Sequence, residues 1–308
     1  MKASGRDYYF IIFKSKQFFT KHMSSFGNGL KTTIFLALLT ALLLWVGNLI
    51  GGYSGLAIAF VFVIIMNFSM YWWSDKIVLW MYKAKELPKN HPVNKLVKEV
   101  ADDAGLPMPR TYMIESATPN AFATGRGPKH SAVAVTNSIL TLLTNDELKG
   151  VLAHELTHVK NRDTLIQTIA AVIAGIISYI ASMARWAAIF GGGNSNDNRG
   201  NNNIISLLVL TIVTPLIALI IQLAISRTRE YMADEGSADI LHDGKPLSSA
   251  LKKLEKANSI RPFRQGEGTP ATGSLFIVNP FRGSFLVQIL STHPPMEKRI
   301  AKLEAMKF

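Results

Sequence analysis

Four long apolar segments constrain this chain more than any other feature of its sequence. An α-helix needs about 20 consecutive apolar residues to cross the hydrocarbon core of a bilayer. The four segments run over residues 32–50, 55–73, 165–190 and 204–225. None of them holds an acidic residue, and the only basic one is Arg185. This pattern predicts four transmembrane helices, and the alternative is a set of buried core helices in a large soluble protein.

The basic residues predict on which side of the membrane each polar part lies. Cytoplasmic loops carry an excess of lysine and arginine. Basic residues gather before the first span, after the second and after the fourth, whereas the short links at 51–54 and 191–203 are almost uncharged. We therefore expect both termini on the cytoplasmic side. The predicted parts are a basic N-terminal lead (1–31), a first transmembrane hairpin (32–74), a cytoplasmic catalytic part (75–164), a second transmembrane hairpin (165–225) and a second cytoplasmic catalytic part (226–308).

The polar parts have the signals of a small α+β body. Residues 92–104 and 245–258 have helical spacing, and 110–115 and 131–136 read as short strands. Thr144 and Glu147 form a capping-box pattern that opens a further helix. A last short helix begins at the prolines that follow His293. A strand around residues 274–278 is also expected.

The composition excludes several kinds of site. The chain has no cysteine, so disulfides, thiolate metal sites and cysteine nucleophiles are all excluded. Any metal must be held by His, Asp or Glu. The formal net charge of +12 could point to nucleic acid. The basic residues flank apolar spans, however, and no recognition motif accompanies them, so we expect a lipid bilayer and not nucleic acid as the partner.

The stretch "VLAHELTHVKNRD" carries the metal-binding signal. His154 and His158 are four residues apart, so they lie on one face of a helix and can bind one zinc ion together. Glu155 is turned away by about 100° and can instead reach a water molecule beside the metal as a general base. The alternative is a pair of interfacial histidines on a capped helix. The pattern predicts two ligands and a base.

A catalytic zinc keeps three protein ligands and one open position, so a third ligand is expected. The stretch "SRTREYMADEGSADIL" follows the fourth span and holds Glu230 and Asp234 one helical turn apart. The hairpin of spans three and four should bring this helix beside the first. We expect Glu230 to bind the metal and Asp234 to accept the free N–H of a ligand histidine. Glu235 and Asp239 are the rival ligands, and an ion pair of Glu230 with Arg227 or Arg229 is the alternative.

Four stretches together resemble the HtpX family of bacterial integral-membrane zinc metallopeptidases, which is related to the endopeptidases that trim prenylated C-termini. They are "VLAHELTHVKNRD", "SRTREYMADEGSA", "PNAFATG" and "STHPPMEKRI". The resemblance runs from about residue 32 to the C-terminus. It implies a mostly α membrane protein in which four transmembrane helices accompany a cytoplasmic α+β zincin-type catalytic domain with a small sheet.

The resemblance also implies roles for individual residues. One zinc ion would be held by His154, His158 and Glu230, with Glu155 as the base. "PNAFATG" would be a substrate-lining edge strand, with Asn120, Ala121 and Phe122 at the cleft, and a turn with a buried Phe is the alternative. His293 would stabilise the oxyanion of the transition state, and a structural capping role is its alternative.

The expected function is endoproteolysis of misfolded membrane or membrane-associated proteins on the cytoplasmic side of the bacterial inner membrane, as protein quality control. The site's place at the membrane boundary favours membrane proteins as substrates, whereas the quality-control role rests on the resemblance. Two alternatives stay open. The chain could process a defined or lipid-modified substrate, or it could be a non-catalytic membrane adaptor that keeps zinc for structure.

Overall fold

The computed structural model describes residues 5–165, 167–169, 227–260, 277 and 294–308. The predicted spans at 165–190 and 204–225 therefore lie almost wholly outside the described residues, and His293 lies outside them too. Of the strand expected around residues 274–278, only Ile277 is described. The description covers the first predicted hairpin and most of the predicted catalytic body.

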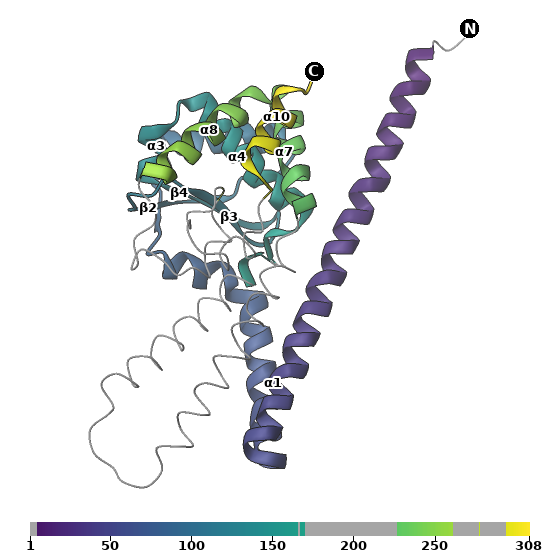
Figure 1. Cartoon of the computed structure of the whole chain (residues 1–308), viewed down its shortest axis with the longest axis vertical. Coiled ribbons are helices and arrows are strands. Elements are labelled where there is room, and N and C mark those ends of the chain that lie inside the picture. The colour runs from purple at the N-terminus through teal and green to yellow at the C-terminus, as the bar shows by residue number, and fades with distance from the viewer. Residues whose placement is uncertain (1–4, 166, 170–226, 261–276, 278–293) are drawn as a thin grey trace.

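Helix α1 (Gly5–Met81) consists of two helical arms that meet at a turn far from the body (Figure 1). The turn lies at Gly51 and Gly52, which leave helical geometry, and Gly52 has a φ of 55° and a ψ of −138°. A side chain makes that conformation costly, which explains why the reversal uses glycine. Between the arms, Asn67 Nδ2 donates to Thr40 Oγ1 at 3.0 Å. The predicted spans at 32–50 and 55–73 thus lie on successive arms.

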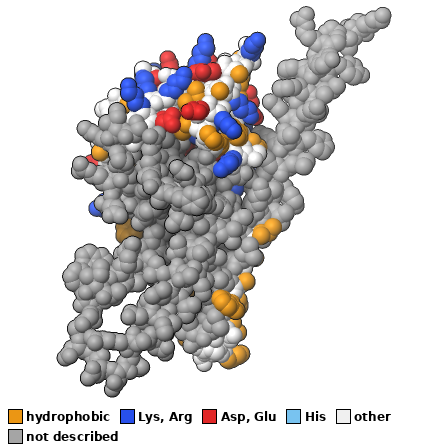
Figure 2. All heavy atoms as spheres, viewed as in Figure 1, with side chains coloured by type: hydrophobic (Ala, Val, Ile, Leu, Met, Phe, Trp, Pro, Cys, Tyr) orange, Lys and Arg blue, Asp and Glu red, His pale blue; other side chains and the backbone are white. Residues whose placement is uncertain are grey.

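The second arm, Gly51–Met81, is the one helix among the described residues that is long and apolar enough to cross a membrane. Its 31 residues extend about 46 Å at 1.5 Å per residue, more than the hydrocarbon core requires. Large apolar side chains are exposed along it, among them Phe62, Ile65 and Trp73. Figure 2 shows hydrophobic side chains on this lower part of the molecule, whereas Lys, Arg, Asp and Glu gather on the upper body.

The body contains a four-stranded sheet in the order β1-β2-β4-β3. Strands β2 and β4 are parallel, and the two outer strands pair antiparallel with them, so β3 forms one edge. The predicted small sheet is therefore present, and the two predicted strands are β2 and β4. The strands are β1 (Lys85–Glu86), β2 (Arg110–Ile114), β3 (Ala121–Gly127) and β4 (His130–Thr136).

Helix α4 (Asn145–Asn161) is the centre of the body, since it packs against two neighbouring helices, α7 and α8, and against β3. Figure 1 shows α4, α7, α8 and α10 together on one side of the sheet. Apolar residues of these elements form a common buried cluster, among them Val97, Leu152 and Leu251. The remaining helices are α2 (Pro92–Asp103), α3 (Asn137–Leu142), α7 (Arg227–Leu241), α8 (Lys245–Ile260) and α10 (Met296–Glu304).

The predicted capping box starts α4. Thr144 Oγ1 accepts from the backbone of Glu147, and the Glu147 carboxylate accepts in return from the backbone of Thr144. The same carboxylate binds α8, because Ser249 Oγ donates to it at 2.6 Å and Lys253 Nζ at 2.7 Å. Burial raises the pKa of the Glu147 carboxyl, but these bonds outweigh burial and lower the pKa to about 2. The helix start is thereby fixed to its neighbour.

Helices α4 and α7 approach closely because Gly236 has no side chain. A Cβ at Gly236 would lie 2.4 Å from Cγ2 of Thr157. That threonine cannot easily turn away, since its hydroxyl donates to the carbonyl of Ala153 at 2.8 Å. On the same interface, Ser237 Oγ donates to the carbonyl of Gly150 at 2.8 Å. The contact sets how far α7 lies from the histidines of α4.

We predict that Gly236→Ala lowers the thermal unfolding midpoint of the detergent-solubilised protein. The added methyl group overpacks the α4–α7 interface, which costs about 1–3 kcal/mol. Because Thr157 supplies the clash, the double variant with Thr157→Ala should unfold at a higher temperature than the single Gly236→Ala variant. A Gly236→Ala protein with an unchanged midpoint would show that the helices can separate freely.

Candidate metal centre

The two histidines of α4 lie side by side in the interior. His154 and His158 are one helical turn apart, and their ring centroids are 4.8 Å apart with the planes at 89°. Both side chains are buried, as is the Glu155 side chain between them in the sequence. A helix places residues i and i+4 on one face, so the geometry follows directly from the sequence spacing.

Glu230 of α7 brings a carboxylate to this histidine pair. Its Oε2 lies 3.7 Å from His154 Nε2, and its Oε1 lies 3.6 Å from His158 Nε2. The three ligand atoms all lie within 4.8 Å of one another. Ligand distances of about 2.0–2.2 Å in a tetrahedral site place such atoms about 3.4 Å apart. The triangle could therefore hold a zinc-sized ion with little rearrangement.

Each histidine has a carboxylate behind its Nδ1 atom. Asp234 Oδ1 lies 3.0 Å from His154 Nδ1, and Asp163 Oδ2 lies 3.0 Å from His158 Nδ1. The second contact depends on how α4 ends. Arg162 adopts the left-handed conformation (φ 58°, ψ 32°), which turns the chain back so that Asp163 lies over the last turn. A carboxylate at Nδ1 favours the tautomer that leaves Nε2 free to bind a metal.

Arg299 of α10 contacts the carboxylates of both Asp234 and Glu230. Its side chain is fully buried, and it donates to both carboxylate oxygens of Asp234 at 2.7 and 2.8 Å. One of its nitrogens also lies 3.5 Å from Glu230 Oε2. Burial raises the pKa of the Asp234 carboxyl, but Arg299 outweighs burial and lowers it. Arg299 therefore keeps Asp234 ionised and orients it toward His154.

Glu155 is held by the edge strand of the sheet. The backbone N–H of Ala123 in β3 donates to Glu155 Oε2 at 3.0 Å. Burial raises the pKa of the Glu155 carboxyl above its usual value. A carboxylate of raised basicity, fixed beside the histidine pair, is suited to accept a proton from water.

The charges around the site favour a divalent cation. With the carboxyl groups ionised and both histidines neutral, four buried carboxylates face two buried guanidinium groups among the described residues, which leaves a net charge of −2. Without a metal, the surrounding carboxylates, Asp163 foremost, outweigh burial and raise the pKa of the His158 ring to about 9, so a proton on that ring supplies one of the missing charges. Uncompensated buried charge is costly, so the cluster favours two added positive charges. The charged groups are Glu155, Asp163, Glu230, Asp234, Arg229 and Arg299.

The rival ligands lie away from this centre. Glu235 is part-exposed and pairs with Lys302 Nζ at 2.5 Å, and Asp239 is exposed. Of the acids considered on α7, the structure thus brings Glu230 and Asp234 to the histidines. His293 lies outside the described residues, so its predicted place at the site stays a prediction.

The predicted substrate-lining residues are the first two of β3 and the residue directly before it. Asn120, Ala121 and Phe122 are buried. The side-chain oxygen of Asn120 accepts from the backbone of Ile277 at 3.2 Å, and the Phe122 ring lies 5.3 Å from the ring of Tyr82. The Phe side chain therefore packs inside the body, although Phe122 lies in a strand and not in the turn that the alternative expected. The following residue, Ala123, is the one that contacts Glu155.

Sequence reasoning assigned no role to Asp163 or Arg299. Asp163 follows a helix by two residues, and only the turn at Arg162 brings it back to His158. Arg299 falls on the same face of α10 as the apolar Leu303. An arginine on the buried face of a short amphipathic helix is the sequence pattern that could have indicated its role. Such a residue needs a buried acidic partner.

Comparisons with known proteins show what this chain is similar to. The profile of Peptidase family M48 matches residues 88–307, which include every residue of the site. A "Protease HtpX homolog" from Syntrophobacter fumaroxidans is 48% identical over 283 residues, 91% of this chain and 100% of that protein. "Protease HtpX" from Legionella pneumophila subsp. pneumophila is 50% identical over 279 residues, 91% and 99%. The crystal structure of S. mikatae Ste24p has 18% identity and a TM-score of 0.48 over 92% of this chain and 67% of that one.

We predict that Arg299→Met weakens metal binding by about 10–100-fold, the usual effect of losing a partner behind a metal ligand. Asp234 would lose its two hydrogen bonds and would stay buried without a counter-charge, so the protein should also unfold at a lower temperature. Metal affinity is measured by competition with a chromophoric chelator. The exposed neighbour Lys298 provides the matched control, Lys298→Met, which should bind metal as the wild type does. Equal affinity in both variants would contradict the positioning role of Arg299.

Proposed function

Because the chain belongs to peptidase family M48, a family of metal-dependent peptidases, we propose that it is a zinc endopeptidase that cleaves membrane or membrane-associated proteins at the cytoplasmic face. The single observation that supports this most is the buried triangle of His154, His158 and Glu230. Two imidazoles and one carboxylate leave a fourth position open, as catalytic zinc sites do. Structural zinc sites have four protein ligands and often use cysteine, which this chain lacks. The donor set therefore favours an enzyme over an adaptor.

The site residues would have separate roles in peptide hydrolysis. A zinc ion held by the three ligands supplies Lewis acidity, which lowers the pKa of water and polarises a peptide carbonyl. Glu155 takes the proton of the attacking water and passes it to the leaving amine. Asp163 and Asp234 keep the two ligand histidines in the tautomer that binds through Nε2. We further propose that His293 donates to the developing oxyanion.

Strand β3 suits the binding of an extended substrate. It forms one edge of the sheet, and an edge strand can pair with a peptide through backbone hydrogen bonds. The strand also holds Glu155 through Ala123, so a peptide paired along this edge would lie beside the base. We propose that the segment beginning with Asn120, Ala121 and Phe122 lines the cleft, with its backbone and not the buried Phe side chain in contact with substrate.

We propose a multi-pass topology with both termini and the active site in the cytoplasm of a bacterial inner membrane. The two arms of α1 support the first hairpin, since they reverse at Gly52 and carry the predicted spans in opposite directions. The second hairpin is proposed from residues 165–225 alone. The basic lead before the first predicted span and the lysines after the second span favour the cytoplasmic side for the body.

We predict that Glu155→Gln abolishes peptide cleavage and leaves metal binding intact. Glutamine keeps the shape of the side chain but cannot take up a proton, so only the chemical step should be lost. The measurement is bound zinc per chain together with cleavage of unfolded casein by the detergent-purified protein. Glu235→Gln makes the same chemical change on α7, away from the metal triangle, and should retain activity. Full cleavage by Glu155→Gln would remove Glu155 from the mechanism.

The proposed physiological role is quality control of misfolded membrane proteins. We predict that cells lacking this chain degrade a destabilised membrane protein more slowly, and that the wild-type gene, but not Glu155→Gln, restores the rate. The half-life of the substrate in a pulse-chase experiment measures this. Equal half-lives with and without the chain would refute the role.

Competition of casein cleavage by a prenylated peptide, but not by its unmodified form, would instead favour a processing enzyme for lipid-modified substrates.

A further inference from the structure

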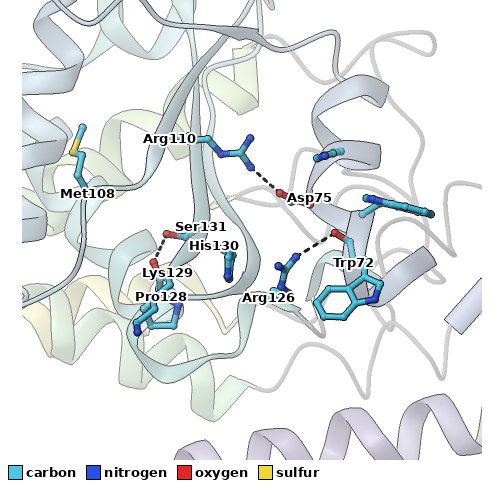
Figure 3. A pocket seen from close by; sticks show the side chains of 11 residues that line it. Trp72, Asp75, Met108, Arg110, Arg126, Pro128, Lys129, His130 and Ser131 are labelled. Carbon is cyan, nitrogen blue, oxygen red and sulfur yellow. Dashed lines mark hydrogen bonds and ion pairs between the residues drawn. The ribbon is translucent and has the colours of Figure 1, made fainter. Parts of the chain in front are cut away.

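A pocket separate from the candidate metal centre lies where α1 joins the body. It has a volume of about 470 Å³ and lies between the end of the second arm, the start of β2 and the turn that joins β3 to β4. Figure 3 shows Arg110, Arg126 and Lys129 around it, with Trp72 on the α1 side. None of the residues proposed for peptidase chemistry lines it. A volume of this size suits a small ligand.

The lining of the pocket is strongly cationic. Four basic side chains contribute to it, those of Lys76, Arg110, Arg126 and Lys129, against the single carboxylate of Asp75. Arg110 pairs with that carboxylate at 2.8 Å and neutralises it. In the described part of the chain, neither Lys76 nor Lys129 forms an ion pair. The pocket therefore has an excess of positive charge and favours an anionic ligand.

Arg126 is held in place by Trp72 of the second arm of α1. Its guanidinium group lies 4.6 Å from the centroid of the Trp72 ring, and its Nη1 donates to the carbonyl of Trp72 at 3.3 Å. Stacking on an aromatic face restricts the side chain while leaving other N–H groups available. A planar guanidinium group in a fixed orientation can bind two oxygens of a phosphate at once.

The position of the pocket along α1 indicates where the anion comes from. Large apolar side chains are exposed along the second arm to Trp72 and Trp73, with Trp80 exposed two turns further on, and aromatic residues mark the headgroup level of a bilayer. Asp75 and Lys76 follow within one turn, about 5 Å further along the helix axis. The cationic pocket thus begins where the phosphate groups of the lipids would lie.

We propose that this pocket binds the phosphate group of an anionic phospholipid of the cytoplasmic leaflet. Basic pockets beside membrane helices on the cytoplasmic side are suited to such headgroups. The bound lipid would hold the hairpin between β3 and β4 at the membrane surface and so fix how far the body stands from the bilayer. The proposal rests on the second arm crossing the membrane, and it does not rest on the peptidase chemistry.

The test is native mass spectrometry of the full-length chain in detergent, carrying Glu155→Gln to prevent self-cleavage. The protein is titrated separately with phosphatidylglycerol, phosphatidylcholine and inorganic phosphate. We expect phosphatidylglycerol to bind at concentrations at which the zwitterionic lipid and free phosphate do not. The double substitution Arg126→Gln with Lys129→Gln should weaken phosphatidylglycerol binding by about tenfold, since each basic residue near the surface contributes to such binding.

Two further variants complete the test. Lys129→Gln alone changes an exposed lysine that forms no ion pair among the described residues, so it should fold normally and bind the lipid a few-fold more weakly. Lys307→Gln removes the same charge near the C-terminus, at a position that does not line the pocket, and should bind as the unsubstituted chain does. Equal binding of both lipids, or wild-type affinity in the double variant, would overturn the proposal. Equal binding of inorganic phosphate would reassign the pocket to a free anion. Binding is read without any cleavage assay, so a failed lipid site leaves the peptidase assignment untouched.

Discussion

The structure depends on bringing negative charge into the interior of the body and balancing it there. Four carboxylates converge around His154 and His158, and two arginines offset only half of that charge. Burying such groups is unfavourable unless each has a partner. Arg299 supplies one partner from α10, and a divalent ion between the histidines and Glu230 would supply the rest. The metal centre and the packing of α4, α7 and α10 are therefore parts of one electrostatic arrangement.

Strand β3 connects the second arm of α1 with the candidate metal centre. Phe122 at its start packs against Tyr82, which directly follows α1, and Ala123 donates its N–H to Glu155. Further along the strand, Arg126 stacks on Trp72 of the membrane arm. One edge strand thus contacts the C-terminal part of the second arm, the residue that follows it and the proposed base Glu155. In the proposed topology, this packing would set the distance between the bilayer and the site.

Much of the fold and the core of the site could be predicted from local sequence patterns. The helices over 92–104 and 245–258, the capping box at Thr144 and the strands β2 and β4 are present as expected. Membership of a peptidase family was indicated by four short motifs, and the comparisons confirm it. These features were predictable because helix caps, periodicity and an i, i+4 ligand pair are all set by residues close in sequence.

The sequence by itself determined the two histidines proposed as ligands, the glutamate beside them and the apolar arm that could cross a membrane, because each depends on spacing within one helix. Tertiary structure decided what lies around them. Among Glu230, Glu235 and Asp239, only packing of α7 against α4 through Gly236 could show which carboxylate reaches the histidines. Asp163 reaches the site through a left-handed turn at the end of α4. Arg299 reaches it from α10, 65 residues after its partner Asp234 in the chain. Contacts between distant segments depend on how whole helices and strands pack, and no local sequence pattern predicts them.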